Sequence, residues 1–291
     1  MIAVDAGSSQ ISVLRILPGG LLALVRGGVV PSAGVLPVSV AVHGNLVYVA
    51  NAGTGGSSYT GFRLTPVGRM APVPGSAISL PSGSQPGDVL FNGTGTKLAG
   101  TRVGTSQIDT FTVGPDGRLT AAPGSPFPAQ GLGPFGGEFR PTNPGQLFVS
   151  NAHNTAVNSG TVSAFTDSAN GTLSPVTGSP FADGQMAPCW VEISHDGQFL
   201  FTVNTGSGTI SRYSINPDGS LILLGSTPVG ATGGAGAVDA RLSPDGGYLF
   251  VDESRIGAVG AFAVNGGNLT ELGSSPTSLP AGATPAGIVV N

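Results

Sequence analysis

Residues able to do acid–base chemistry are few in this chain, and several of them lie close together. Among the residues at the ends of the predicted second strands, Asp252, Glu253 and Arg255 form the one place where charges of both signs cluster. A carboxylate can act as a general base toward water, and an arginine can stabilise the oxyanion that forms when water attacks a carbonyl. Such a segment would suit an anionic, hydroxylated substrate, but a surface ion pair would explain the same residues.

A histidine in a long loop is the second candidate for acid–base work. His153 lies in the predicted loop 152–160, whereas His43 and His195 fall in short turns. A loop histidine changes its charge near neutral pH, so it can act as a general acid, a base or a ligand. The alternative is a solvated side chain without a chemical role.

Two sets of glycine-containing turns recur roughly every 50 residues and define a repeat. The first set contains Gly44, Gly95, Gly145, Gly197 and Gly246, and the second contains Gly19, Gly68, Gly117, Gly171, Gly219 and Gly266. Between the turns lie short runs rich in β-branched and aromatic residues, such as 46–51 and 199–204. No segment places apolar residues at helical spacing over three turns. The sequence therefore predicts an all-β propeller made of four-stranded antiparallel blades.

The two chain ends predict how the last blade is completed. The tail, Ala283–Val290, reads like a first strand, and the head, Ile2–Asp5, reads like a second. Pairing them would remove an unpaired sheet edge. We therefore predict one domain, residues 1–291, with six blades and a ring closed by the C-terminal strand pairing with the N-terminal strand; the alternative is an incomplete seven-bladed propeller. The predicted blades span about 37–85, 86–133, 134–186, 187–235 and 236–280, with a split blade of 1–36 and 281–291.

Polar residues recur at alternate positions when the first strands are aligned on their entry proline. Among them are Asp88, Glu138, Glu192, Asp239 and Arg241. Alternation places this set on one face of each strand, near the propeller axis. The four carboxylates predict a site for a divalent cation such as calcium, or a group that polarises a carbonyl. The alternative is a water-filled channel whose carboxylates bond to water and backbone.

Several strand–turn segments resemble the lactonase-type β-propellers, the family of 6-phosphogluconolactonase-like and carboxymuconate cyclase-like proteins. They are residues 108–127, 202–221 and 243–251, and the resemblance extends over the whole chain. Family members look seven-bladed, and the enzymes carry a Pro-Arg-His run in a first strand and a glutamate at the end of the second. Glu253 stands at that glutamate position, but the preceding strand, 236–242, reads GAVDARL. The resemblance implies a lactone hydrolase or a lactone-forming cyclase.

Two classes of function stay open. The first is hydrolysis of small lactones of sugar acids, or of related carboxylated compounds, at the long-loop face of the central channel. Its predicted catalytic residues are Glu253, His153 and Arg255, with a carboxylate or His153 as base and Arg255 or a cation at the oxyanion. The second is a non-catalytic propeller that binds protein or glycan, or a scaffold without a site. The missing Pro-Arg-His run favours the second class.

Composition excludes several partners and leaves the location open. The net charge is −4 without a basic stripe, which argues against nucleic acid. No apolar run reaches membrane-spanning length, and the single cysteine, Cys189, excludes an internal disulfide. Beyond a cation, no cofactor is predicted. We expect a monomer. We also expect an exported protein, since cysteine and lysine are so few; this chain shows no signal peptide, and a cytoplasmic location stays open.

Overall fold

The computed structural model describes the whole chain except residues 155, 231–233, 235 and 291. By its internal contacts the chain divides into two compact units. Unit 1 comprises Met1–Pro128 and Ala169–Thr172, and unit 2 comprises Ala129–Ser168 and Leu173–Asn291. The single domain expected from the sequence stays a prediction.

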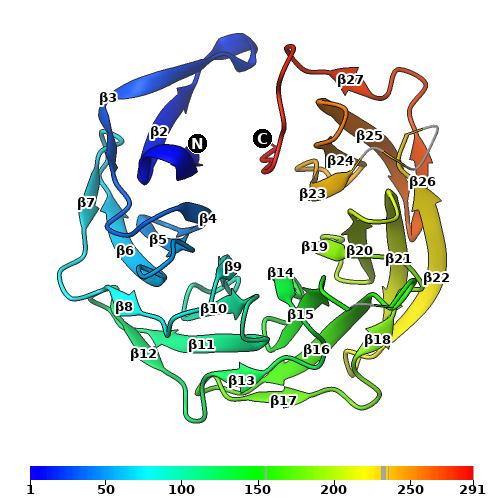
Figure 1. Cartoon of the computed structure of the whole chain (residues 1–291), viewed down its shortest axis with the longest axis horizontal. Coiled ribbons are helices and arrows are strands. Elements are labelled where there is room, and N and C mark those ends of the chain that lie inside the picture. The colour runs from blue at the N-terminus through cyan, green and yellow to red at the C-terminus, as the bar shows by residue number, and fades with distance from the viewer. Residues whose placement is uncertain (155, 231–233, 235, 291) are drawn as a thin grey trace. The chain divides into compact units, whose positions relative to one another are not determined.

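Unit 1 holds three antiparallel sheets, which can be followed by their labels in Figure 1. The first contains β1 (Ile2–Asp5), β2 (Gln10–Ile16) and β3 (Leu22–Pro31). The second contains β4 (Pro37–His43), β5 (Leu46–Asn51), β6 (Ser58–Leu64), β7 (Met70–Pro72) and β8 (Ile78–Ser79). The third contains β9 (Pro86–Phe91), β10 (Lys97–Arg102), β11 (Gln107–Val113), β12 (Leu119–Ala121) and β13 (Phe127–Pro128).

Unit 2 holds three further antiparallel sheets. The fourth sheet contains β14 (Pro134–Phe139), β15 (Gln146–Asn151), β16 (Thr161–Asp167), β17 (Leu173–Pro175) and β18 (Phe181–Ala182). The fifth contains β19 (Pro188–Ile193), β20 (Phe199–Asn204), β21 (Thr209–Ile215) and β22 (Leu221–Pro228). The sixth contains β23 (Ala237–Leu242), β24 (Tyr248–Glu253), β25 (Ala258–Asn265), β26 (Asn268–Glu271) and β27 (Thr277–Ser278).

The prediction of an all-β propeller fold with six blades is confirmed. Each sheet is one blade, and the described helices are two single 3₁₀ turns, η1 (Ala6–Ser8) and η2 (Pro18–Gly20). In four sheets the last strand is split into two short pieces that pair with the same third strand. Prolines interrupt it there, as in the run from Ala121 to Phe127, because proline has no N–H for the ladder. The strand β22 has no internal proline and stays continuous.

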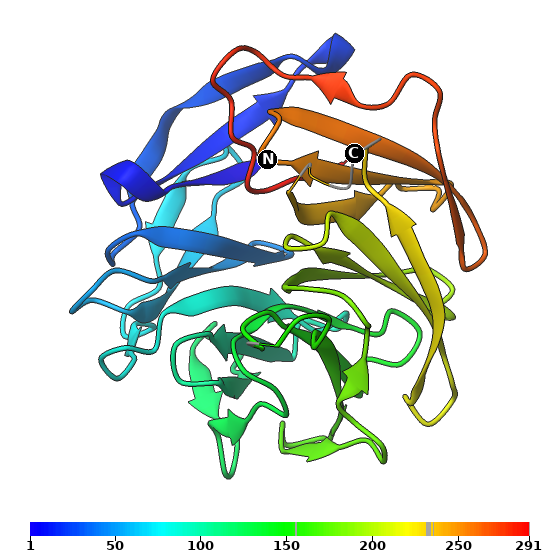
Figure 2. The same ribbon diagram turned by 45° about the vertical axis from the view of Figure 1, so that its right-hand side comes forward.

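The strand predicted in the tail is not formed. The described tail residues 279–290 belong to no sheet, so the sheet of β1, β2 and β3 has three strands (Figures 1 and 2). An entry proline and a glycine two places on also occur in β14, so Pro285 and Gly287 do not by themselves exclude a strand; what the tail lacks is an unpaired second strand among the described strands of unit 2. The N–H of Ile288 instead donates to the Asp239 carboxylate at 3.0 Å. Closure by strand pairing was therefore a wrong expectation for these residues.

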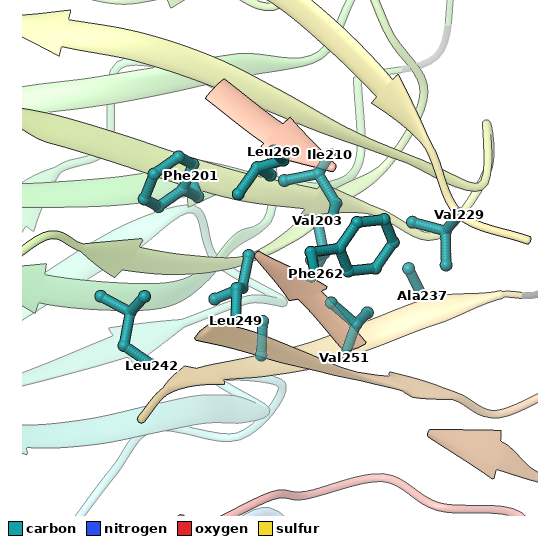
Figure 3. Packing of buried hydrophobic residues seen from close by; sticks show 11 residues of the cluster. Phe201, Val203, Ile210, Val229, Ala237, Leu242, Leu249, Val251, Phe262 and Leu269 are labelled. Atoms are coloured by element: carbon teal, nitrogen blue, oxygen red, sulfur yellow. The ribbon is translucent and has the colours of Figure 1, made fainter. Parts of the chain in front are cut away.

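Apolar side chains from neighbouring sheets form the core of each unit. In unit 2, Leu249, Val251 and Phe262 of the sixth sheet are fully buried against Phe201 and Val203 of the fifth (Figure 3). Successive strand residues point to opposite faces, so the odd-numbered positions of β24 all enter this core. The other face of β24 is more open, and Tyr248 on it is 42% exposed.

Replacing Phe262 should therefore cost far more stability than replacing Tyr248. Phe262→Ala removes a fully buried ring and leaves a cavity, with an expected loss of about 3–5 kcal/mol in the free energy of unfolding. Tyr248→Ala on the open face of the same sheet should cost less than about 1 kcal/mol. Urea unfolding of both variants measures the difference, and equal losses would contradict the assigned faces of β24.

Candidate functional site

One polar position recurs at the end of a strand in all six sheets. The strands β1, β5, β10, β15, β20 and β24 end on Asp5, Asn51, Arg102, Asn151, Asn204 and Glu253. In five sheets this side chain bonds to the third residue of the next strand. The pairs are Asp5–Ser12 at 2.6 Å, Asn51–Thr60 at 3.1 Å, Arg102–Asp109 at 2.6 Å, Asn151–Ser163 at 2.9 Å and Asn204–Ser211 at 2.9 Å. Each pair satisfies polar groups where a strand enters a loop.

The sixth sheet departs from this pattern. The third residue of β25 is Gly260, which has no side chain to bond with Glu253. A Cβ at Gly260 would overlap Oε1 of Glu253, so the absence of a side chain at Gly260 leaves the space that the longer glutamate occupies. The other five sheets have a hydrogen-bonded pair of side chains at this place. The sixth has a large residue, Glu253, packed against a glycine, Gly260.

Glu253 is consequently a buried carboxyl group without a bonding partner. Its exposed fraction is 0%, and among the residues that the structure describes neither of its oxygens has a hydrogen-bond partner. Burial raises the pKa of the Glu253 carboxyl to about 7, and the negative charge of Glu271 adds to the rise. Glu253 shares its face of β24 with Leu249 and Val251, so it points into the core between two sheets rather than into solvent.

A second group of polar residues lies on the first strands of unit 2, and we call it the first-strand cluster: Trp190, Glu192, Asp239 and Arg241. Arg241 Nη1 contacts Glu192 Oε2 at 2.6 Å, and the arginine side chain is 35% exposed. Its Cζ lies 5.4 Å from the centre of the Trp190 ring, within the range of a cation–π contact. The predicted alternation of polar residues along the first strands thus places an ion pair and the chain's single tryptophan together.

Asp239 is a carboxyl group of the first-strand cluster whose pKa is strongly shifted. Burial raises its pKa to about 7, while the positive charge of Arg241 and the backbone N–H groups of Ile288 and Ala240 oppose the rise. Asp252 on the adjacent strand raises it further. Burial likewise raises the pKa of Asp252 to about 6, against a hydrogen bond from the backbone of Gly287. Both carboxyls can therefore exchange protons near neutral pH.

The three predicted catalytic residues are not joined to one another. His153 is exposed in the turn after β15, Arg255 is exposed in the turn after β24, and Glu253 is buried. Within the described part of the chain, no hydrogen bond or ion pair connects any two of them. The fourth and sixth sheets, which carry His153 and Glu253, are separated by the fifth, which packs against both. Their catalytic roles stay predictions.

The carboxylates predicted as cation ligands have backbone and side-chain partners. Glu138 Oε2 accepts the N–H of Ile193 at 2.6 Å, and Glu192 Oε1 accepts the N–H of Leu242 at 2.9 Å. Asp88 belongs to unit 1, where Ser39 donates to it at 2.7 Å. Over the described residues, no three His, Cys, Asp or Glu side chains are grouped as a metal ion would require. The cation stays a prediction that this geometry does not support.

A family model describing the seven-bladed β-propeller lactonases matches residues 3–286. The chain belongs to this lactonase family. Among solved structures, a Bacteroides uniformis protein provisionally named a 6-phosphogluconolactonase is 22% identical, with a TM-score of 0.79 over 96% of this chain and 81% of that one. A periplasmic gluconolactonase of Pseudomonas aeruginosa is 19% identical, with a TM-score of 0.76 over 96% of this chain and 79% of that one. No curated protein matches the chain. At these identities the solved structures show a common fold.

The resemblance to the lactonase-type propellers is thus confirmed. The chain has six blades, whereas the family is described as seven-bladed. No described helix is long and apolar enough to cross a membrane. The alignment of the first strands places Trp190 in the same row as Asp239 and Arg241 in the same row as Glu192, but it does not predict the contact between Trp190 and Arg241. Gly260 was also missed, although it is the one third-position residue without a side chain among the six strands β2, β6, β11, β16, β21 and β25.

The fit between Glu253 and Gly260 predicts strong coupling between the two positions. Gly260→Ser alone forces a Cβ against the Glu253 carboxyl and should cost about 1–3 kcal/mol of unfolding free energy. The double variant Glu253→Asn with Gly260→Ser recreates the Asn–Ser pair of the fourth and fifth sheets, so it should recover most of that loss. Chemical denaturation of both single variants and the double variant measures the coupling, and additive effects would contradict the pairing.

Glu253 also predicts how stability depends on pH. A buried carboxyl whose pKa is raised stabilises the fold below its ordinary pKa, and this contribution is lost as pH rises through about 7. Glu253→Gln keeps the shape of the side chain without its charge. The free energy of unfolding of the variant, relative to that of the parent, should therefore rise by on the order of 2 kcal/mol between pH 5 and pH 8. Urea midpoints at each pH measure the gap. Asp116→Asn, which changes an exposed carboxylate, should leave the parent's pH dependence unchanged.

Proposed function

We propose that this chain hydrolyses lactones of small sugar acids at the first-strand cluster of unit 2. The observation that carries the proposal is the pair of Asp239 and Arg241, two residues apart on β23 and therefore on the same face of that strand. Burial raises the pKa of Asp239 to about 7, which suits a general base at neutral pH. Arg241 places a positive charge beside it, where a carbonyl oxygen would gain negative charge.

The reaction would proceed by addition of water and opening of the ring. The Asp239 carboxylate takes a proton from water as the water oxygen bonds to the lactone carbonyl carbon. Arg241 donates a hydrogen bond to the oxyanion of the tetrahedral intermediate. The bond between that carbon and the ring oxygen then breaks, and the ring oxygen takes the proton from Asp239. One lactone and one water give one hydroxy acid, and Asp239 ends as a carboxylate.

Neighbouring side chains would set the orientation and the substrate class. Glu192 holds one guanidinium nitrogen of Arg241 at 2.6 Å, which leaves its remaining N–H groups to face a ligand. The Trp190 ring lies beside the guanidinium of Arg241 and adds an apolar surface next to that charge. An arginine also favours an acidic substrate. The gluconolactonase and 6-phosphogluconolactonase names of the structural neighbours agree with a sugar-acid lactone.

The catalytic residues predicted from the sequence, Glu253, His153 and Arg255, have no step in this mechanism. The carboxyl of Glu253 lies inside the core and would need a change of side-chain position to meet a substrate. His153 and Arg255 lie on exposed turns at the ends of β15 and β24. If Asp239 proves dispensable, Glu253 becomes the next carboxylate to replace. A chain without any lactonase activity would favour the non-catalytic binding function.

The proposal predicts a pH profile controlled by Asp239. Above the spontaneous rate, hydrolysis of glucono-1,5-lactone should rise with pH to a plateau with a midpoint near 7, because the base must be deprotonated. Asp239→Asn should lower kcat/KM by about 10²–10⁴-fold and remove that midpoint. Arg241→Gln should lower kcat by about 10²–10³-fold, and Arg241→Lys should lose less. Proton release in a pH-stat measures each rate.

Asp245→Asn provides the matched control. Asp245 lies in the turn after the same strand, and hydrogen bonds from Ser243 and Gly247 keep its pKa below the ordinary value. This variant should keep the parent's kcat/KM and its midpoint. A parent protein that does not accelerate hydrolysis of any sugar-acid lactone, or an Asp239→Asn variant as active as the parent, would overturn the proposal.

A further inference from the structure

Three arginines of unit 1 line a hollow in the surface of that unit. The hollow has a volume of about 590 Å³, within the range of small-molecule sites. Arg15 and Arg26 come from the hairpin of β2 and β3, which Figure 2 draws in blue, and Arg69 comes from the turn between β6 and β7. Two different sheets therefore place positive charge around one space.

These arginines have no acidic partner. Within the described residues, none of the three side chains makes an ion pair or a hydrogen bond to a carboxylate. The four carboxylates of unit 1 have other partners: Asp5 with Ser12, Asp88 with Ser39, Asp109 with Arg102 and Asp116 with Arg118. Unit 1 holds seven basic and four acidic residues, and unit 2 holds four basic and eleven acidic ones. Unit 1 thus has an excess of basic residues, and three of them stand around this hollow.

The remaining wall of the hollow is apolar. Leu17, Leu24 and Val67 line it with exposed fractions of 36%, 58% and 65%. These large aliphatic side chains therefore stay open to solvent beside the guanidinium groups. A ligand that covers them would have to be apolar at one end and anionic at the other.

We propose that this hollow binds an amphipathic anion, a carboxylate or phosphate head on an alkyl chain. Arg15, Arg26 and Arg69 hold the head, because guanidinium groups bond to carboxylate and phosphate through two parallel N–H groups. The chain lies on Leu17, Leu24 and Val67 and removes their surface from water. Such a ligand is either a free fatty acid or a lipid of an anionic bilayer. The site shares no residue with the first-strand cluster, so it does not depend on the lactonase proposal.

Two probes separate the sources of the ligand. Free decanoate is titrated into the full-length protein in a calorimeter, with decanol as the neutral compound of equal chain length. Vesicles of phosphatidylglycerol are compared with vesicles of phosphatidylcholine by co-sedimentation. We expect one decanoate bound per chain and little heat from decanol. Binding to phosphatidylglycerol vesicles without binding of decanoate would support the site and assign it to a bilayer lipid.

Variants test whether the arginines make the site. Arg15→Gln with Arg69→Gln should weaken decanoate binding at least tenfold, whereas Arg63→Gln with Arg118→Gln, an equal loss of two charges elsewhere in unit 1, should not. Val67→Asp, at a side chain 65% exposed, should weaken binding by repelling the head without harming the fold. Equal binding of decanoate and decanol, unchanged binding in the arginine variants, or binding of neither decanoate nor anionic vesicles would overturn the proposal.

Discussion

Side-chain acceptors on one first strand bind backbone N–H groups of the next, and this interaction joins successive sheets. In unit 2, Glu138 accepts the N–H of Ile193 and Glu192 accepts that of Leu242, at 2.6 and 2.9 Å. In unit 1 the hydroxyl of Ser39 accepts the N–H of Val89 at 3.2 Å. Buried backbone groups that lack such partners cost stability, so the polar first-strand positions have a structural duty before any chemical one. Residues that appear suited to bind a ligand are also what hold neighbouring sheets in register.

The same constraint explains how far the sequence alone could go. Turn glycines and strand alternation are local features, and they correctly predicted an all-β fold of six antiparallel sheets. Partner identity is not local, because it depends on which neighbouring strand supplies the opposing group. The burial of Glu253 was predictable in part: it shares the parity of Leu249 and Val251, whose side chains are fully buried. The fit to Gly260 needed the register of β24 with β25, which no sequence pattern states.

The tail illustrates the limit of pattern matching more directly. Its entry proline and alternating apolar residues match the first strands of the repeat, and Ile288 does donate to Asp239 as Leu242 does to Glu192. What it lacks is a second strand to pair with among the strands of its own unit. The side-chain bond between first strands thus forms without the ladder, which shows that the two interactions are separable. Alignment detects the residue that makes the side-chain bond between first strands. It cannot detect that the backbone ladder is missing.

Unusual chemistry then arises where the repeat is broken. Glu192 and Asp239 lie on successive first strands, but Glu192 is neutralised by Arg241 at 2.6 Å, whereas Asp239 is buried near Asp252 and bonded to the tail. Glu253 stands where three other sheets have asparagine, and it has no hydrogen-bonding partner because the facing residue is Gly260. The raised pKa values of Asp239, Asp252 and Glu253 therefore all belong to the sixth sheet and share one cause, which is burial without full compensation. A regular repeat satisfies its polar groups and leaves them inert, so departures from the repeat are where a reactive group has to be sought.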